Sequence, residues 1–509
     1  MNKEGALVIG GDYRALGVVR SLGRQGIPVW VLTNEHLLAT VSRYTRKVLR
    51  WPHAEHEQLN CLLQLCDSHN LKSWTIFPSN DEAAAFVSRR YSELSTRYRL
   101  TTSPWRSLQW SYDKRLTYRI AVDAGVDQPQ AFFPTDRSEV GSLKCTFPVV
   151  VKPTVKQEMN AFTYAKAWRA SNRSELLSLY DKACAFVNPS TIMIQEFIPG
   201  GGEEQVSYAA LCREGQVQLS LTAKRLRQHP IEFGRASSFV ETADIPDIEG
   251  PSRRLLSIIG LTGLVEIEYK RHPSTGSYQL LDINPRVWGW QTLAGRAGID
   301  FPYLMWQMIH GEPLPQVHAR TGVRWIRMFT DVRAAAAEVR CGRLSILEYL
   351  NSFRSPLEFA VFAVDDALPA VLDIPLLAWL HFKRKLQSPH VYEYAKGVNA
   401  DHQQEVAGHR RGDAGRAHDP GARALSNAAR KSWLVLVPHH EELPDAAVLH
   451  PGRVEQRSNR KHCPMDAAGP VQHRTDAHLR RHHHQRDQRH APGHRGAGQV
   501  RRRRGQDPG

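Results

Sequence analysis

Short apolar runs alternate with helical patterns over the first hundred residues. Ala6–Ile9, Val29–Leu32 and Trp74–Phe77 are apolar runs, and residues 16–22 place leucine and valine at helical spacing. Runs this short and this uniformly apolar are typical of parallel strands buried on both faces, and the intervening period predicts helices. We therefore expect residues 1–110 to form a small doubly wound α/β domain.

After residue 110 the pattern changes to strands that follow one another directly. The expected helices are Asp113–Ala124, Ser174–Ala185 and Ser252–Ile259, and the expected strands are Phe147–Lys152, Thr191–Glu196, Val206–Leu211, Val217–Lys224 and a β-hairpin over Leu264–Ile283. Such a mixture is typical of an α+β fold. We assign residues 111–310 to a second domain and residues 311–395 to an extension of further helices and strands.

The extension ends in an apolar run, Leu376–Leu380, followed by the basic triplet Lys383–Lys385. This order could lie on a membrane surface, but we favour a packed C-terminal helix. The chain has no run of 18 apolar residues and its N-terminal residues lack the apolar stretch of a signal peptide. We therefore expect a cytoplasmic protein without a membrane span.

Residues 396–509 differ in composition from everything before them. From residue 401 onward the chain holds 20 Lys and Arg against 12 Asp and Glu, which is half of the net charge of +16. Periodicity fades around His482–His484 and Arg501–Arg504, so we expect a disordered tail, or the product of a shifted reading frame. Metal or nucleic-acid binding by these tracts is an alternative. Because half of the net positive charge lies in the tail, the overall charge is weak evidence for a nucleic-acid partner, and none is expected. The seven cysteines contain no CxxC pair, which indicates reduced thiols.

The hairpin carries the most informative chemistry. Side chains alternate along a strand, so Glu266 and Glu268 share one face of the first strand, as Asp282 and Asn284 do on the second. If the turn centres near Thr275, Glu268 lies opposite Asp282 and Glu266 opposite Asn284. These side chains would repel one another unless cations are present.

Oxygen ligands of this kind suit Mg²⁺, and either Glu266 or Glu268 could be the first acidic ligand. Arg286 follows Pro285 directly and could stabilise phosphoryl charge. The opposite face of the hairpin is expected to supply core through Val265, Ile267, Leu281 and Ile283.

Two lysines lie where an anion could meet them. Lys152 ends the apolar strand that begins at Phe147, and Lys114 and Arg115 follow Asp113, a good helix N-cap. Cations in a first helical turn oppose the helix dipole, and a bound anion would reverse that penalty. Ordinary exposed cations would explain these positions equally well.

A third region combines a strand with a glycine-rich turn. Ile192–Glu196 is followed by Ile198, then by Gly200–Gly202, and then by Glu203 and Glu204. Free backbone groups at the end of such a strand can pair with the edge of adenine, and an acid shortly afterwards can hold ribose. An ordinary strand and loop is the alternative.

Two further segments admit more than one interpretation. Lys224, Arg225 and Arg227, with Arg235 beyond a glycine, could bind a triphosphate or an acidic substrate, or could form a solvated basic edge. Gly10-Gly11, with Glu35 as a ribose acid, suggests a dinucleotide site, but the glycine spacing does not fit that fingerprint. A tight turn explains these glycines better.

Taken in order, these segments resemble the ATP-grasp superfamily over residues 5–390, in particular its carboxylate–amine ligase or carboligase branch, with carbamoyl-phosphate synthetase and D-aspartate ligase as relatives. Glu268 followed after fourteen residues by Asp282–Arg286 is the most specific part. The resemblance implies that Lys114 and Lys152 contact ATP phosphates. It also implies that Glu196 and Ile198 read adenine and that Glu203 or Glu204 holds ribose.

The resemblance further implies two Mg²⁺ ions, with Mn²⁺ as a possible substitute, on Glu268, Asp282 and Asn284. Catalytic contacts would come from Arg286, Lys224 and Arg225. The partners would be a small carboxylate and an amine, and related enzymes are often homodimers. The activity implied is ATP-dependent ligation through an acyl phosphate, and a catalytically weak ATP-binding module is the alternative. One departure is the loop Thr154–Asn160, which lacks the glycines usual in the family.

Overall fold

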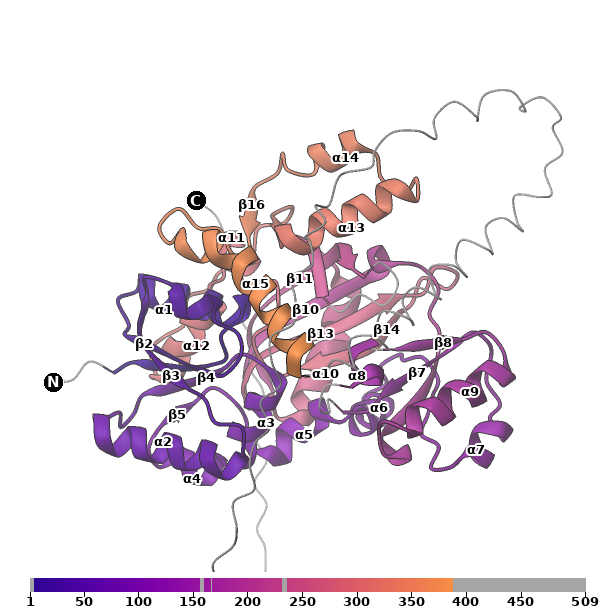
Figure 1. The fold of residues 1–509 in the computed structure, drawn as a ribbon, viewed down its shortest axis with the longest axis horizontal. Coiled ribbons are helices and arrows are strands. Elements are labelled where there is room, and N and C mark those ends of the chain that lie inside the picture. The colour runs from indigo at the N-terminus through magenta and orange to yellow at the C-terminus, as the bar shows by residue number, and fades with distance from the viewer. Residues whose placement is uncertain (1–3, 156–159, 166, 231–235, 388–509) are drawn as a thin grey trace, which may run out of the picture. The chain divides into compact units, whose positions relative to one another are not determined.

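The computed structural model describes residues 4–155, 160–165, 167–230 and 236–387, all of which belong to one structural unit of the chain (Figure 1). The segment predicted as a disordered tail, residues 396–509, lies outside the described residues, as do Arg235 and the middle of the loop Thr154–Asn160. Within the described ranges no helix is both long and apolar enough to cross a membrane. The six cysteines found there are free thiols.

The N-terminal domain is a parallel sheet with the strand order β3-β2-β1-β4-β5. Its strands are β1 (Ala6–Ile9), β2 (Val29–Thr33), β3 (Thr45–Arg50), β4 (Thr75–Pro78) and β5 (Arg99–Leu100). Its helices are α1 (Tyr13–Arg24), η1 (Leu38–Val41), α2 (Glu55–His69), α3 (Asp81–Arg89) and α4 (Tyr91–Ser95). This confirms the predicted doubly wound sheet, in which the uniformly apolar runs are strands buried on both faces.

The second layer of the fold is a four-stranded antiparallel sheet with the order β6-β9-β7-β8. Its strands are β6 (Ala131–Phe132), β7 (Val149–Pro153), β8 (Trp168–Ala170) and β9 (Ile192–Glu196). The helices of this region are α5 (Trp105–Tyr112), α6 (Lys114–Asp123), α7 (Arg137–Ser142), α8 (Ala161–Ala165), α9 (Arg173–Cys184) and η2 (Pro189–Thr191). The predicted cap of α6 is present, because the Asp113 carboxylate accepts a hydrogen bond from the Arg115 amide at 2.9 Å.

A larger sheet of seven strands, ordered β14-β13-β10-β11-β12-β15-β16, makes up the rest of the body. Its strands are β10 (Gln205–Arg213), β11 (Gln216–His229), β12 (Ala236–Thr242), β13 (Gly263–Arg271), β14 (Tyr278–Asn284), β15 (Arg324–Ile326) and β16 (Leu357–Phe359). The predicted strand Val217–Lys224 is thus five residues too short at its C-terminal end. β15 and β16 come from the predicted extension and complete the edge of this sheet.

Helices connect and cover the seven strands. They are η3 (Gly202–Glu204), η4 (Pro246–Ile248), α10 (Glu249–Ile259), α11 (Gln291–Ala297), α12 (Phe301–Ile309), α13 (Met328–Arg340), α14 (Ile346–Asn351) and α15 (Leu368–Gln387). The expected helices at 174–185 and 252–259 correspond to α9 and α10. The predicted packed C-terminal helix is α15, whose Ala370 and Leu376 lie against the main core.

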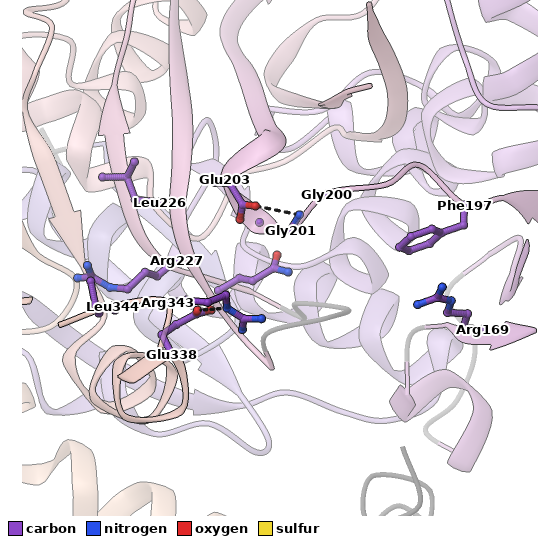
Figure 2. Close-up of a pocket in the computed structure, with 12 residues that line it drawn as sticks. Arg169, Phe197, Gly200, Gly201, Glu203, Leu226, Arg227, Glu338, Arg343 and Leu344 are labelled. Atoms are coloured by element: carbon purple, nitrogen blue, oxygen red, sulfur yellow. Dashed lines mark hydrogen bonds and ion pairs between the residues drawn. The ribbon is translucent and has the colours of Figure 1, made fainter. Parts of the chain in front are cut away.

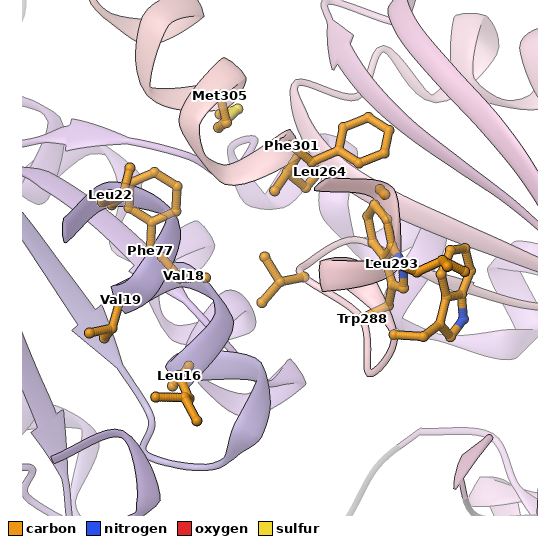
Figure 3. Packing of buried hydrophobic residues seen from close by; sticks show 14 of the residues in the cluster. Leu16, Val18, Val19, Leu22, Phe77, Leu264, Trp288, Leu293, Phe301 and Met305 are labelled. Atoms are coloured by element: carbon orange, nitrogen blue, oxygen red, sulfur yellow. The ribbon is translucent and has the colours of Figure 1, made fainter. Parts of the chain in front are cut away.

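The main core joins the N-terminal domain to the seven-stranded sheet. Leu16, Val19 and Leu22 of α1 belong to the same buried cluster as Trp288 and Leu293, which follow β14 (Figure 3). Gly17 lets the two parts approach, because a Cβ atom there would lie 2.7 Å from the Gln291 amide nitrogen. The residues after the hairpin are therefore held against the N-terminal domain.

Candidate functional site

The β13–β14 hairpin has the predicted register. Glu268 pairs with Asp282 and Glu266 pairs with Asn284, so the four polar side chains share one face of the ribbon. A bulge follows Glu268, and the next pair is Tyr269 with Leu280. The prediction that Leu281 supplies core is therefore wrong: Leu281 lies at the bulge and is half-buried, whereas Leu280 is fully buried.

We call the side chains of Glu266, Glu268, Asp282 and Asn284 the acidic patch. Glu266 is the most buried of the four. Its carboxylate accepts hydrogen bonds from the Trp290 indole at 2.7 Å and the Ser207 hydroxyl at 3.1 Å, and its residue is 5% exposed. Burial, together with repulsion from Glu268, raises the Glu266 pKa to about 7. Glu268 is the more accessible of the two carboxylates, so the geometry favours Glu268 over Glu266 as the first acidic ligand of a metal ion.

The remaining oxygen donors lie next to Glu268. The Asn284 amide nitrogen donates to Glu268 at 3.1 Å and to Glu266 at 3.3 Å. The Asp282 carboxylate accepts a hydrogen bond from the Lys114 ammonium at 2.6 Å, and Arg225 lies 3.5 Å from Glu268. The cations that permit this close packing of acids are thus side chains of the protein.

The oxygen donors of the hairpin fit a magnesium ion in type. In the described part of the chain, no group of three or more His, Cys, Asp or Glu side chains is arranged to hold a metal. The donors Glu268, Asp282 and Asn284 nevertheless have the chemistry that Mg²⁺ prefers. A bound ion would replace Lys114 as the partner of Asp282 and Arg225 as the partner of Glu268.

Arg286 is held in a buried network at the far end of the patch. Its guanidinium donates to the Asp81 carboxylate at 2.7 and 3.1 Å, to the Asn284 side-chain oxygen at 3.0 Å and to the Val287 carbonyl at 3.0 Å. Burial, and repulsion from Arg14, lower its pKa to about 10, so Arg286 stays charged at neutral pH. Asp81 belongs to the N-terminal domain, so this pair connects that domain to the acidic patch.

Tyr118 lies near Lys152 and near the Asp282 that binds Lys114. Lys152 lies on the β7 face that Gln195 shares, and its ammonium is 5.9 Å from the centre of the Tyr118 ring. Gln195 donates to the Tyr118 hydroxyl at 2.8 Å. Burial, together with the charge of Asp282, raises the Tyr118 pKa. Tyr118 therefore lies among Lys152, Asp282 and the Lys114 that Asp282 binds.

The strand end at β9 is tied to the hairpin by Lys270. This lysine donates to the Ile198 carbonyl at 2.8 Å and to the Gly200 carbonyl at 2.6 Å. Burial lowers its pKa to about 8, although Glu203 and Glu204 oppose the shift. Because Glu266, Glu268 and Lys270 alternate along one face of β13, the patch runs from Arg286 to the strand end at Ile198.

Glu196, which the sequence predicts to contact adenine, donates its amide to the Gln130 carbonyl at 3.0 Å. Its side chain turns toward the Thr146 amide, at 3.3 Å, instead of the hairpin. Among the described residues, no hydrogen bond engages the Ile198 amide, which leaves this donor available to a ligand. Glu203 accepts from the Gly201 amide at 3.1 Å.

A cavity of about 630 Å³ adjoins this strand end (Figure 2). Figure 2 shows Phe197 and Arg169 on one side, the Gly200–Glu203 turn in the middle, and residues of β11 and the α13 region on the other. The lining residues are Arg169, Phe197, Gly200, Gly201, Gly202, Glu203, Leu226, Arg227, Gln228, Glu338, Arg343 and Leu344. The cavity therefore lies beside Glu203, which the sequence predicts to hold ribose.

The basic segment of β11 divides between the two faces of its sheet. Ser207 pairs with both Glu268 and Ala223, which places Arg225 on the acidic face and Lys224 on the opposite one. Lys224 forms an ion pair with Glu241 at 2.9 Å. The expectation that Lys224 joins Arg225 in the site is therefore wrong.

Arg227 serves a structural ion pair. Its guanidinium binds both oxygens of the buried Asp331 of α13 at 2.9 Å, and Ser238 also donates to that carboxylate. The contact fixes α13 beside the cavity. Of the three cations in this strand, only Arg225 reaches the acidic patch.

Neither Gly10-Gly11 nor Glu35 is arranged as a dinucleotide site would require. Asp12 caps α1 by accepting hydrogen bonds from the Arg14 and Ala15 amides, and Glu35 is bound by Arg384 at 2.6 Å. Gly10 has φ +123°, and a Cβ atom there would lie 2.0 Å from the Ser79 hydroxyl. This conformation and this approach favour the tight-turn explanation.

Four residues of the site were not predicted from the sequence. They are Asp81, Tyr118, Lys270 and Trp290. The sequence could have indicated Lys270, because this residue continues the alternation of Glu266 and Glu268 along the strand. The others depend on contacts between segments far apart in the chain.

One family model matches part of this chain. Residues 188–330 match the family model described as ATP-grasp in the biosynthetic pathway with Ter operon. That segment extends from Asn188, just before η2, to Thr330 in α13, and it includes the hairpin. No curated protein matches the sequence.

Solved structures resemble the fold at low sequence identity. The biotin carboxylase domain of the Hydrogenobacter thermophilus 2-oxoglutarate carboxylase, in complex with MgADP, ADP and bicarbonate, is 14% identical with a TM-score of 0.52 over 64% of this chain and 74% of its own. Rhizobium etli pyruvate carboxylase is 13% identical with a TM-score of 0.51, over 64% of this chain and 30% of its own. An N5-carboxyaminoimidazole ribonucleotide synthetase in an ADP complex is 11% identical with a TM-score of 0.50, over 62% and 79%. At these identities the likeness is one of fold.

Proposed function

We propose that this chain is an ATP-grasp enzyme, and more narrowly an ATP-dependent ligase that activates a carboxylate and joins it to an amine. The observation that carries the proposal is the single face of β13, on which Glu268 and Lys270 connect the Asn284–Arg286 end of the patch to the strand end at Ile198. A nucleotide lying along that face would meet base contacts at one end and cations for its phosphates at the other.

We assign the following roles as part of this proposal. The Ile198 amide would donate to adenine, Glu203 would hold ribose, and Lys114 and Lys152 would contact phosphate oxygens. Glu268, Asp282 and Asn284 would hold Mg²⁺, which when bound neutralises charge on the terminal phosphates. Arg286 would stabilise the charge that develops on the transferred phosphoryl group.

The reaction proposed has two balanced steps. A carboxylate oxygen of the substrate attacks the γ-phosphorus of ATP, the bond to the β-phosphate oxygen breaks, and ADP leaves behind an acyl phosphate. The amine nitrogen then attacks the acyl carbon, inorganic phosphate departs, and the nitrogen loses a proton. The protein contributes position and electrostatic stabilisation, and no covalent bond to the enzyme is needed.

A second candidate is an ATP-binding module with little turnover. It is favoured by the ion pairs Lys114–Asp282 and Arg225–Glu268, which occupy the groups that a ligase needs. ADP release from the full chain, screened against pools of amino acids and sugar acids, separates the two. A ligase gives ADP only with a matching acid and amine. Tight ATP binding with no ADP release across all pools supports the module and contradicts the ligase.

A further inference from the structure

A cavity of about 510 Å³, separate from the one beside Glu203, is lined by α12 and by residues on either side of that helix. Most of its lining is apolar and includes Leu304 of α12 and Leu314 and Val317 of the following segment. Leu304 is buried, and Leu314 and Val317 pack against the main core, so these walls are formed before any ligand arrives. A preformed cavity with mostly apolar walls is typical of a small-molecule site.

The one charged group in the lining of this cavity is the half-buried carboxylate of Asp300. The Ser21 hydroxyl of α1 donates to it at 2.6 Å, and among the described residues Asp300 forms no ion pair. Burial raises the Asp300 pKa, although hydrogen bonds from Ser21 and the Tyr303 amide and the charge of Arg24 oppose the shift. Carboxylates withdrawn from water are ordinarily paired with a cation, because desolvation of an isolated charge costs free energy.

Three arginines in this region leave the Asp300 carboxylate unpaired. Arg24 is bound by both oxygens of Asp365, each at 2.8 Å. Arg320 donates to the Arg296 carbonyl at 2.6 Å, and neither of these two arginines lines the cavity. The negative charge of Asp300 is therefore available to a cationic ligand.

The other polar groups at the cavity also favour a ligand that donates hydrogen bonds. The His318 carbonyl lies 3.7 Å from the position that a Cβ atom of Gly298 would take, and no hydrogen bond from a described residue reaches it. The Gln307 amide nitrogen already donates to the Glu312 carboxylate at 3.1 Å. An anionic ligand would be repelled by Asp300, whereas an ammonium group would find a carboxylate and a carbonyl that accept its hydrogen bonds.

We propose that this cavity binds a small primary amine, with the ammonium group on Asp300 and an alkyl or aryl body against the apolar walls. The Ser21 hydroxyl uses one lone pair of the carboxylate and orients it, which leaves further lone pairs for the ligand. None of the lining residues belongs to the candidate nucleotide and metal site, so the proposal does not depend on the proposed function.

The first test is calorimetry of the full chain with phenethylamine, phenethyl alcohol and phenylacetate. These three probes share an aromatic body and differ in the charge of the head group. We expect one phenethylamine to bind per chain, with a Kd at least about 10-fold lower than that of either other probe, because only the ammonium forms a charge-assisted hydrogen bond to Asp300. Equal affinity for the amine and the alcohol overturns the proposal, and so does no binding of phenethylamine at millimolar concentrations.

The second test uses variants of the cavity. Asp300→Asn keeps the shape of the side chain but removes its charge, and should raise the Kd for phenethylamine by about 10-fold. Glu312→Gln is the matched control, because Glu312 is an exposed acid outside the lining, and its Kd should be unchanged. Leu314→Trp keeps the carboxylate but reduces the cavity, and should weaken the binding of phenethylamine.

Thermal unfolding of each variant shows whether it is folded, and Leu314→Trp carries the test if Asp300→Asn does not fold. Unchanged phenethylamine binding in a folded Asp300→Asn or in a folded Leu314→Trp overturns the proposal. The same conclusion follows if Glu312→Gln weakens binding as much as Asp300→Asn does.

Discussion

The ion pair between Asp81 and Arg286 gives the sharpest test of the candidate site. Asp81 is the first residue of α3, and Arg286 follows the hairpin that carries the acidic patch. Both residues are at most 9% exposed, and two hydrogen bonds of 2.7 and 3.1 Å join them. We expect that Asp81→Asn leaves Arg286 buried, charged and without its main partner.

The size of the effect follows from burial. Removing one member of a buried ion pair typically costs about 3–5 kcal/mol, because the other charge remains uncompensated. Asparagine keeps one acceptor oxygen, so we expect the lower end, about 3 kcal/mol in the free energy of unfolding. If Arg286 stabilises the transferred phosphoryl group, its altered position should also lower kcat for ADP release by on the order of 10²-fold. The KM for ATP should change much less.

The assays are urea unfolding and steady-state ADP release with the full chain. Glu82→Gln is the matched control, because Glu82 is the next residue of the same helix but is exposed; its effect should stay within about 0.5 kcal/mol. Asp81→Glu, which keeps the charge, should recover part of kcat. If Asp81→Asn behaved like Glu82→Gln in both assays, the coupling of the N-terminal domain to Arg286 would be refuted.

Three further predictions concern the same face of the hairpin. Asp282→Ala and Asn284→Ala should each abolish Mg²⁺-dependent ATP turnover, and unchanged turnover in both would remove the metal assignment. The folded-state pKa of Glu266 is raised to about 7 from 4.5. Between these pH values the folded state therefore binds a proton that the unfolded state lacks, and stability falls as pH rises. Glu266→Gln should remove this fall, so that urea unfolding at pH 5 and pH 7.5 differs less than in the wild type; an equal pH dependence in both proteins would contradict it. Lys270→Met should raise the Kd for ATP by about 10-fold through loss of two hydrogen bonds to the strand end, measured by calorimetry, with Lys224→Met on the opposite face as an unaffected control.

The sequence was sufficient to predict those parts of the site that depend on neighbouring residues. The alternation of Glu266 and Glu268, together with the position of the turn, predicted the pairing of the hairpin, because register and facing depend on neighbouring residues alone. The buried parallel strands of the N-terminal domain and the cap at Asp113 followed for the same reason.

The failures have a common cause. Lys224 and Arg225 are adjacent and chemically alike, and the pairing of β11 with β10 decides which of them faces Glu268. A bulge, which the strand pattern did not reveal, moved Leu281 out of the core. Asp81 reaches Arg286 from 205 residues away, through packing that no local pattern encodes.

The acidic patch is electrostatically balanced by the protein itself, and this constrains how a nucleotide could enter. Lys114 neutralises Asp282, Arg225 neutralises Glu268, and Asp81 neutralises Arg286. A metal ion approaching Asp282 must displace Lys114, and a phosphate approaching Lys114 must displace Asp282. When the metal and the phosphate arrive together, the phosphate binds the Lys114 that the metal has displaced. The metal in turn binds the Asp282 that the phosphate has displaced. Either one alone would leave a partly buried charge without its partner. The arrangement therefore favours the metal–nucleotide complex over its separate components.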